Sequence, residues 1–223
     1  MVLKLFFDAM SQPSRSVMLL LKCNSIAYTP KFVNVAKGEQ FSDEFKRINP
    51  TAKVPAIQDN DFTLFESEAI LKYLCATQSL PDHWYPKDQK ARSKIDEYLA
   101  WHHTALRMGA AMTFRHAILI PRLTGKPPKD ASKYIKLLKS SLDLFENYFI
   151  CGTKFISSNE ITIADLMAVT ELSQLEVMGE NAPPLSPKVE EWKKRCINAT
   201  EPHYSEVHQV MYKVQKAVAS SKL

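Results

Sequence analysis

Hydrophobic and polar residues alternate in short blocks through the first third of the chain and form longer helical stripes after it. Residues 3–7 are a short apolar run that predicts a strand, followed by a turn at residues 8–13. The apolar residues of 17–21 then recur at helical spacing and predict the buried face of a first helix. Pro13 fits the first turn of this helix, where no N–H is needed, so Ser11 should lie just before the helix begins.

The next two blocks predict a strand and a short helix. Residues 28–35 are expected to form a second strand, with Val33 and Val35 on one face. Residues 41–48 are expected to form a helix that ends before Asn49-Pro50, because the residue before a proline is pushed out of helical conformation.

Two short apolar runs predict a hairpin after these elements. The runs cover residues 54–57 and 62–65 and flank the polar turn 58–61, and a third helix should follow from Ser67. The resulting order βαβαββα is typical of an α/β thioredoxin-like domain, in which the first strand-to-helix turn presents the reactive group. Ser11 occupies that turn.

The rest of the chain is predicted to be helical. Residues 78–87 contain two prolines and no helical stripe, which indicates a linker. Two apolar stripes follow, separated by a break at residues 121–128, and they predict two antiparallel helices. The stripes are Ala91, Ile95, Tyr98, Leu99, His102 and Leu106, and then Tyr134, Leu137, Leu138, Leu142, Phe145, Tyr148 and Phe149. We therefore expect a first domain at residues 1–77, a linker at 78–87 and an all-α domain at 88–223.

Helix start signals recur later in the all-α part. Thr162 and Asp165 have the spacing of a capping box, and Ile161 and Leu166 complete a hydrophobic staple around it. A further helix should follow Pro187. The last helix is defined by the stripe Val207, Val210, Met211, Val214 and Val218.

The junction between the hairpin and the third helix carries candidate chemistry. Glu66 and Ser67 lie where a strand ends and unpaired helix N–H groups begin. The helix N-terminus and the Ser67 hydroxyl suit a carboxylate and Glu66 suits an ammonium, so the pair fits a free α-amino acid. Pro55 removes a ladder donor and leaves the backbone of Val54 free for an extended ligand. An ordinary hairpin followed by a capped helix fits the same residues.

Composition narrows the class of protein. A chain of 223 residues with 45% hydrophobic content buries a full core, as soluble globular proteins do. Its charge of +5, from 29 basic and 24 acidic residues without long basic runs, favours a solvated surface over a nucleic-acid interface. With only 5 Gly, a glycine-rich phosphate loop is not expected.

The cysteines and histidines predict neither disulfides nor a metal site. Four scattered cysteines have no metal-ligand spacing, and Cys23 should act as a small hydrophobe. His102 and His103 are adjacent and point to different helix faces, so they do not form a metal-binding pair. The chain starts in a strand, without a signal peptide or a membrane-length apolar run, and we expect a cytoplasmic protein with reduced thiols.

Five motifs in fixed order give the chain a specific resemblance. They are SQPSR at residues 11–15, KVPA at 53–56, ESEAI at 66–70, EYLAW at 97–101 and TIAD at 162–165. Together they resemble the cytosolic glutathione S-transferases, most closely the theta class, over nearly the whole chain. The resemblance implies a thioredoxin-like glutathione-binding domain, an all-helical domain that supplies the electrophile pocket, and a homodimer. It implies no cofactor beyond glutathione as co-substrate, and no nucleic-acid or membrane partner.

The resemblance also implies roles for residues around the hairpin. Glu66 and Ser67 would hold the γ-glutamyl group, and the Val54 backbone would pair with the cysteinyl residue of glutathione. Lys53 and Gln40 would approach the glycine carboxylate. Vertebrate theta enzymes commonly have histidine where this chain has Gln40, which donates a hydrogen bond but carries no charge.

Ser11 would be the catalytic residue under this resemblance. A hydroxyl is too weak a base to remove the thiol proton at neutral pH, so Ser11 should donate a hydrogen bond to the thiolate. Such a bond contributes roughly 1.5–3 kcal/mol, enough with the helix N-terminus to bring a thiol pKa from about 8.5 to roughly 6 to 7. If Ser11 is not the donor, the next candidate is Ser14.

The thiolate would attack a small hydrophobic electrophile in an apolar pocket. The candidate pocket residues, by their position in family members, are Met10, Arg107, Met108, Met112 and Phe114. A methionine stripe of this kind also fits plain core. Arg107 needs a partner on this apolar segment, either an anionic leaving group or a neighbouring carboxylate. Arg15 is interpreted as a structural ion-pair residue.

Two alternatives to catalysis stay open. Similar folds serve as interaction domains in translation elongation factor gamma subunits, and a ligand-carrying protein with negligible turnover would keep the same sites. The hydroxyl of Ser11 and the complete γ-glutamyl site favour an enzyme over the interaction domain, whereas a ligand-carrying protein is distinguished from an enzyme by kinetics. The sequence does not identify the electrophile.

Overall fold

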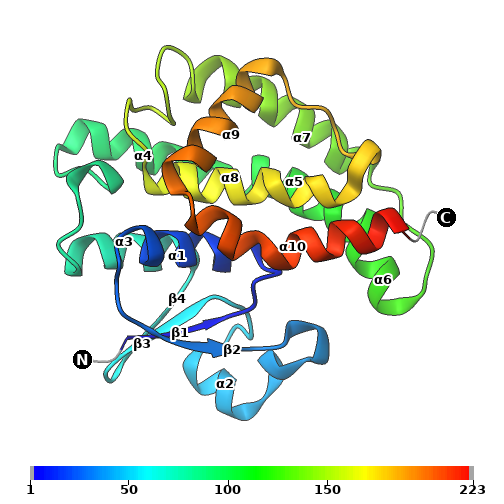
Figure 1. Ribbon diagram of the computed structural model, residues 1–223, viewed down its shortest axis with the longest axis horizontal. Coiled ribbons are helices and arrows are strands. Elements are labelled where there is room, and N and C mark those ends of the chain that lie inside the picture. Colours follow the sequence, from blue (N-terminus) through cyan, green and yellow to red (C-terminus); the bar gives the residue numbers. More distant parts are fainter. Residues whose placement is uncertain (1–2, 221–223) are drawn as a thin grey trace.

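The computed structural model describes residues 3–220, with a mixed four-stranded sheet at the N-terminal end of the chain (Figure 1). The strands are β1 (Leu3–Phe7), β2 (Thr29–Phe32), β3 (Ala56–Asp59) and β4 (Phe62–Phe65), in the spatial order β2-β1-β3-β4. β1 pairs with β2 in parallel, and the other pairs are antiparallel. The predicted α/β domain with a hairpin is therefore confirmed.

Helices cover both faces of this sheet. They are α1 (Gln12–Cys23), α2 (Asp43–Ile48) and α3 (Ser67–Thr77). Figure 1 shows α1 and α3 between the sheet and the helical half of the molecule, with α2 on the opposite face. Phe45 of α2 forms a small separate cluster there with Val33 and Ala56.

The second strand is shorter than predicted. β2 ends at Phe32, and Val35 starts a 3₁₀ turn, Val35–Lys37, instead of continuing the strand. The Val35 N–H donates to the Asp8 carboxylate at 3.1 Å, so it does not enter a strand ladder. Val33 is buried, whereas Val35 is 39% exposed, so the two do not share a buried face as expected.

The second helix begins two residues later than predicted. The Ser42 hydroxyl accepts a hydrogen bond from the Phe45 N–H at 3.2 Å, which makes Ser42 the N-cap and Asp43 the first helical residue. Phe41 precedes this cap and is 61% exposed.

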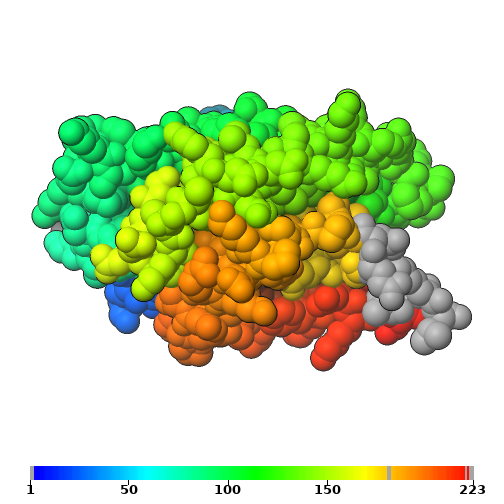
Figure 2. All heavy atoms as spheres, turned by 90° about the horizontal axis from the view of Figure 1, so that it is seen from above, coloured from blue at the N-terminus to red at the C-terminus, as the bar shows by residue number. Residues whose placement is uncertain are grey.

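The remainder of the described chain is helical. It comprises α4 (Gln89–His102), α5 (Leu106–Phe114), the π-helical turn η4 (Arg115–Leu119), α6 (Ile120–Thr124), α7 (Ser132–Leu144), the π-helical turn η5 (Phe145–Phe149), α8 (Ile163–Leu175), α9 (Pro187–Thr200) and α10 (His203–Ser220). Figure 2 shows these helices forming nearly all of the face seen from above, and Figure 1 shows the sheet below them. The predicted all-α second part is confirmed.

Two predicted boundaries in this part are wrong. The first apolar stripe is divided between α4 and α5, because the backbone leaves helical conformation at Ala105 (φ −112°, ψ −96°). The helix also continues through Pro121, which lies in the first turn of α6 after the wider turn η4. The chain leaves α6 only at Gly125, whose φ of +67° is left-handed.

The predicted capping box at the start of α8 is confirmed. The Thr162 N–H donates to Asp165 Oδ2 at 2.9 Å, and the Thr162 hydroxyl caps the first turn of the helix. Asp165 is fully buried and also accepts hydrogen bonds from the Ile156 N–H and the Trp192 indole, each at 2.9 Å. Burial raises the pKa of Asp165 to about 6 against the lowering effect of these donors.

The two halves of the molecule share one apolar core. α1 packs against α8, and Leu5 and Val17 belong to the same buried cluster as Leu166 and Trp192. Because the core continues across α1, the sheet and the helical half hold each other in a fixed orientation. A pocket between them can therefore be shaped by both.

Candidate functional site

The candidate site is a pocket of about 230 Å³ where the two halves meet. It is lined by Pro13, Asn49, Lys53, Val54, Pro55, Glu66, Ser67, His103 and Arg107. The first seven come from the thioredoxin-like half and the last two from the corner between α4 and α5. Four of the predicted glutathione-binding residues, Lys53, Val54, Glu66 and Ser67, are thus brought together in one place.

Ser11 lies beside this pocket, at the N-cap of α1. Its half-buried hydroxyl makes no capping bond and approaches the Val54 carbonyl oxygen at 3.5 Å. Asp8 shapes the turn, because its carboxylate accepts the Met10 N–H at 2.9 Å and its carbonyl accepts the Ser11 N–H at 2.9 Å. Among the described residues the Ser11 hydroxyl makes only this long hydrogen bond, so it can donate instead to a ligand that pairs with Val54.

Ser14 has a different environment from Ser11. It is fully buried, and its hydroxyl has no hydrogen-bond partner within residues 3–220. A group with no exposed surface does not reach a ligand in the pocket without a movement of α1. Between the two serines considered from the sequence, the geometry favours Ser11 as the donor.

A backbone turn at Glu66 sets the direction of the amino-acid site. Glu66 adopts φ +70°, a left-handed conformation that is uncommon for a residue with a side chain and often occurs at functional sites. This turn joins β4 to α3 and places the exposed Glu66 carboxylate next to the first N–H groups of α3. Ser67 is 5% exposed at the start of that helix, where a ligand carboxylate would find unpaired donors.

The opposite wall is formed by the loop before β3. The peptide bond between Val54 and Pro55 is cis, and the Val54 N–H has no hydrogen-bond partner among the described residues. Lys53 is exposed, and its carbonyl accepts the Asn49 side-chain amide at 2.7 Å. Asn49 also accepts the Thr51 N–H at 2.9 Å, so this buried side chain closes the loop and fixes the position of Lys53.

Gln40 does not line this pocket. It is buried in the 3₁₀ turn Glu39–Phe41, and its side-chain oxygen has no partner within residues 3–220. Its approach to a glycine carboxylate stays a prediction that needs a rotation of the side chain.

His103 is a pocket residue that the sequence analysis considered only when it excluded a metal-binding pair with His102. Its Nε2 lies 3.0 Å from Glu68 Oε2, and Glu68 also binds Lys72 at 2.6 Å. The His103 contact and then Lys72 lower the pKa of Glu68 to about 2. No sequence signal identifies His103, because its place in the pocket depends on the corner between α4 and α5.

Arg107 forms an ion pair with Glu171 of α8. Glu171 is 1% exposed, and burial raises its pKa, while Arg107 and Arg15 oppose that rise. The structure thus supplies the neighbouring carboxylate that was one of the two alternatives for Arg107. Arg107 still lines the pocket with 28% of its side chain exposed.

Arg15 is a structural residue, although not through an ion pair. Its guanidinium donates to the Ala9 carbonyl at 2.7 Å, to Gln174 Oε1 at 2.7 Å and to the Thr170 carbonyl at 3.3 Å. No carboxylate lies within ion-pair distance of Arg15 in residues 3–220. Complete burial lowers its pKa to about 10, so Arg15 stays charged at neutral pH.

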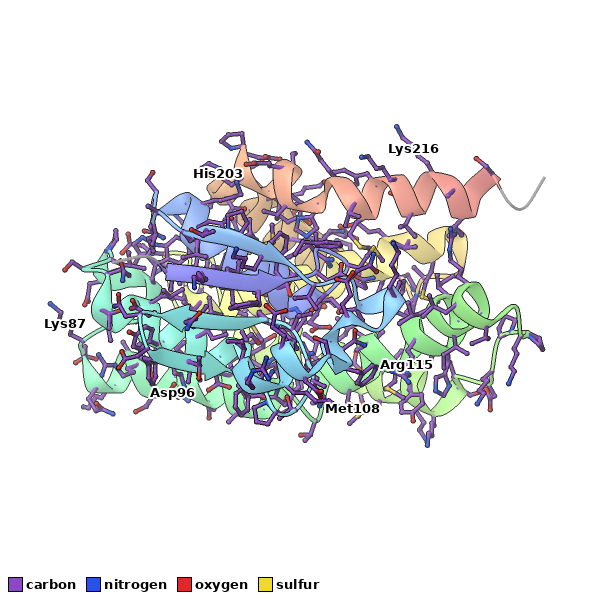
Figure 3. The ribbon with its side chains drawn as sticks, turned by 90° about the horizontal axis from the view of Figure 1, so that it is seen from below. Lys87, Asp96, Met108, Arg115, His203 and Lys216 are labelled. Carbon is purple, nitrogen blue, oxygen red and sulfur yellow. The ribbon has the colours of Figure 1, made fainter. Side chains whose placement is uncertain are left out.

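The candidate electrophile residues are divided between two places. Met10 and Phe114 meet in an apolar cluster with Val177, Met211 and residues of η4 and α10. Met112 is half-buried, whereas Met108 is 41% exposed and labelled at the lower edge of Figure 3. The structure therefore groups Met10, the residue before Ser11, with Phe114 and leaves Met108 on the surface.

Residues 3–220 give no indication of a metal site or a membrane span. No group of three His, Cys, Asp or Glu side chains is arranged to hold a metal ion there. All four cysteines are free thiols, and burial raises the pKa of Cys23 to about 11. The helices of the described part are too short or too polar to span a membrane.

Comparisons with known proteins agree with the site geometry. The family descriptions "Glutathione S-transferase, N-terminal domain" and "Glutathione S-transferase, C-terminal domain" match residues 1–76 and 103–199. Glutathione S-transferase T1 of Arabidopsis thaliana is 44% identical over 225 residues, covering 97% of this chain and 91% of the relative. Glutathione S-transferase theta-1 of Homo sapiens is 38% identical over 218 residues, covering 96% of this chain and 91% of the relative.

Solved structures give the same result. Human glutathione S-transferase T1-1 in its apo form superposes with a TM-score of 0.90 at 38% identity, covering 96% of this chain and 91% of that one. Human glutathione transferase theta-2 in complex with glutathione superposes with a TM-score of 0.91 at 33% identity, covering 99% of this chain and 92% of that one. With both domains matched along nearly the whole chain, the protein belongs to the glutathione S-transferase family, in its theta class.

Proposed function

We propose that this enzyme transfers the thiolate of glutathione to small hydrophobic electrophiles, with the Ser11 hydroxyl stabilising the thiolate. The observation that carries the proposal is the position of the Ser11 hydroxyl, which makes only a long hydrogen bond of 3.5 Å to the Val54 carbonyl among the described residues. It lies beside a pocket whose charged and backbone groups are complementary to a peptide. In the relative theta-2, whose structure contains glutathione, the same fold holds this tripeptide. Its role in this chain would be detoxification by conjugation.

The pocket suggests how glutathione would lie. Its γ-glutamyl ammonium would meet Glu66, and its α-carboxylate would meet Ser67 and the first N–H groups of α3. The cysteinyl backbone would pair with Val54, which places the sulfur next to Ser11. Lys53, and Gln40 after a side-chain rotation, would hold the glycine carboxylate.

The thiolate step follows from these positions. The thiol proton leaves to solvent, because Ser11 is not a base, and the hydroxyl then donates to the anionic sulfur. The first turn of α1 adds unpaired N–H groups that also favour the anion. The electrophile would approach over the half-buried Met10 beside the same turn, which packs on the buried ring of Phe114.

Ser11→Ala tests this mechanism. The substitution should leave the affinity for glutathione within a few fold, since most contacts lie at the two ends of the tripeptide. It should raise the pKa of the bound thiol by roughly one to two units, because one charge-assisted hydrogen bond is lost. Ultraviolet titration of the thiolate in the complex measures that pKa, and turnover should fall at neutral pH while partly recovering in alkaline buffer.

Ser14→Ala is the matched control, since it removes a hydroxyl of the same helix start that is fully buried. An unchanged thiol pKa in Ser11→Ala with a raised value in Ser14→Ala would transfer the role to Ser14. Failure of the parent protein to bind glutathione in calorimetry at millimolar concentration would instead support a non-catalytic interaction or ligand-carrying module.

Assembly and location complete the proposal. We expect the protein to form a homodimer, which sedimentation velocity would test. We also expect the glutathione-binding domain to cover residues 1–77, the linker 78–87 and the all-helical domain 88–223.

A cytoplasmic location is supported by the free cysteines. The last three residues of the sequence are Ser221-Lys222-Leu223, a tripeptide that the peroxisomal import receptor reads at a free C-terminus. Imaging should therefore use an N-terminal label, and punctate labelling would contradict the cytoplasmic proposal.

A further inference from the structure

The positive charge of this chain is concentrated in one part of the helical domain. Residues 115–139, here called the basic lobe, carry seven basic residues and one acidic residue, a formal charge of +6 against +5 for the whole chain. The rest of the chain therefore has a net charge of −1. The basic residues are Arg115, Arg122, Lys126, Lys129, Lys133, Lys136 and Lys139.

These charges have no carboxylate partner among the described side chains. All seven are exposed, and none forms an ion pair with another side chain that the structure describes. The acidic residue of the lobe, Asp130, is occupied by the N–H and hydroxyl of Ser132. The lobe therefore presents positive potential to whatever approaches it.

The basic lobe includes residues that pack against the apolar cluster beside Ser11. Ile118 and Leu119 of η4 pack against the cluster that contains Met10 and Phe114. Met10 directly precedes Ser11 in the chain. The same segment that supplies Ile118 and Leu119 begins with Arg115, and α6 supplies Arg122 directly after it.

Helix α10 borders the same surface. Val210, Val214 and Val218 of α10 are partly buried against this cluster. In Figure 1, the C-terminal end of α10 and α6 lie at the same end of the molecule. Half-buried apolar side chains from the turn before α1, from η4 and from α10 thus meet at a helical segment that carries Arg115 and Arg122 about one turn to either side of Ile118 and Leu119.

This arrangement fits a ligand that has an apolar body and an anionic group at one end. We infer that the preferred electrophiles of this enzyme carry a carboxylate or similar anion, which Arg115 and Arg122 hold while the apolar body lies over Met10, Ile118 and Leu119. The inference rests on the proposed function and adds a substrate class to it. This anion site is separate from Arg107, which lines the glutathione pocket and forms an ion pair with Glu171.

The group transfer itself is unchanged by the anionic group. In 4-(chloromethyl)benzoate, the thiolate forms a C–S bond with the benzylic carbon as the C–Cl bond breaks, chloride leaves, and the thiol proton has already gone to solvent. The carboxylate takes no part in this step. Its methyl ester reacts in the same way without the negative charge.

The test compares these two substrates. For the parent enzyme, kcat/KM divided by the uncatalysed rate with glutathione should be higher for the carboxylate than for the ester. Arg115→Gln/Arg122→Gln should lower that preference by about threefold or more, since each exposed ion pair changes affinity by up to about fivefold. Salt should lower the parent's preference as well, because exposed charges are screened over about 10 Å at 0.1 M.

Lys87→Gln/Lys90→Gln is the matched control, because it removes two exposed charges far from the basic lobe. Figure 3 labels Lys87 and Arg115 at well-separated positions, with Lys87 at the end opposite α6. This control should keep the parent's preference for the carboxylate. A preference lowered equally in both double variants would overturn the inference, because it would show only an effect of net charge.

Binding gives a second readout that does not depend on turnover. S-(4-carboxybenzyl)glutathione should bind the parent more tightly than S-benzylglutathione, and Arg115→Gln/Arg122→Gln should remove the difference. Turnover of the ester without any advantage for the carboxylate would overturn the inference and leave the proposed function standing. Turnover of neither substrate, with no binding of either conjugate, would overturn both.

Discussion

At the scale of single residues, Glu68 is the clearest case of a side chain whose ionisation depends on the fold. It accepts from His103 at 3.0 Å and from Lys72 at 2.6 Å, with 21% of its side chain exposed. These contacts, led by His103, lower its pKa from 4.5 to about 2. A carboxylate with a lowered pKa stabilises the folded state above its unfolded pKa and loses that contribution as the pH falls toward its folded pKa.

We predict that Glu68→Gln lowers the free energy of unfolding by about 1 kcal/mol at pH 6, a value that allows for solvent screening of a partly exposed group. The difference from the parent should shrink as the pH falls from about 4.5 to about 2, because the parent then loses the same charge. Urea midpoints over this range provide the measurement.

Glu160→Gln is the control for this prediction. Glu160 is exposed, and its side chain has no partner among residues 3–220. A similar pH dependence for the two variants would mean that the contacts of Glu68 do not stabilise the fold.

At the scale of elements, helix starts and helix contacts determine how the domains are built. Asp165 does more than complete the capping box of α8, because it also receives the Ile156 N–H and the indole of Trp192 from α9. Its carboxylate therefore joins the loop before α8 to two helices. Neither of these additional partners follows from the sequence spacing.

We predict that Asp165→Ala costs about 3 kcal/mol or more, since several buried donors lose their acceptor at once. Ser42→Ala, which removes the surface cap of α2, should cost about 0.5–2 kcal/mol. Equal losses in urea midpoint for the two variants would show that Asp165 acts only as a cap.

The contact between α5 and α7 depends on the absence of a side chain at Gly109. A Cβ at this position would lie 2.7 Å from the backbone of Leu138. We predict that Gly109→Ala destabilises the protein by about 2 kcal/mol or more, because backbone atoms on both helices must shift.

Gly125→Ala separates this steric effect from backbone strain. Gly125 has a φ of +67°, and no atom lies within 4 Å of the position that a methyl group would take, so its substitution should cost only about 1 kcal/mol. A smaller loss of thermal stability in Gly109→Ala than in Gly125→Ala would contradict the close packing of α5 against α7.

The features that the sequence predicted correctly depend on interactions between residues that are close together in the chain. The hairpin at residues 56–65 and the capping box at Thr162 follow from turn and cap chemistry within a few residues of each other. The position of Ser11 before α1 follows from Pro13 in the first helical turn. Four of the five predicted glutathione-binding residues were placed in one pocket for the same reason, because they belong to two neighbouring turns.

The features that the sequence predicted wrongly depend on contacts between residues that are far apart in the chain. β2 ends early because Val35 donates to Asp8, which lies 27 residues earlier in the chain. His103 enters the pocket because the helix bends at Ala105, and Asn49 enters it because its side chain closes the loop to Lys53. Such contacts form only when separate elements pack, so neither periodicity nor spacing reveals them.

At the scale of the whole molecule, the sheet and the helical domain are joined by both apolar and polar contacts. Arg15 lies in α1 and donates to Ala9 in the turn before α1 as well as to Thr170 and Gln174 in α8. Ser16 adds a bond of 2.7 Å to Thr170. Because these contacts and the shared core cross between the halves, the two should unfold as one cooperative unit.

We predict that the most slowly exchanging amides of β1 and α8 have the same opening free energy in native-state hydrogen exchange. Arg15→Met should lower both values equally, by about 3 kcal/mol or more, since it leaves buried acceptors unpaired and Glu171 with one cation fewer. Lys46→Met, an exposed change confined to α2, should leave both values nearly unchanged. A loss confined to α8, or a second unfolding transition in urea, would show that the domains are stable independently and that Arg15 secures only the helix it contacts.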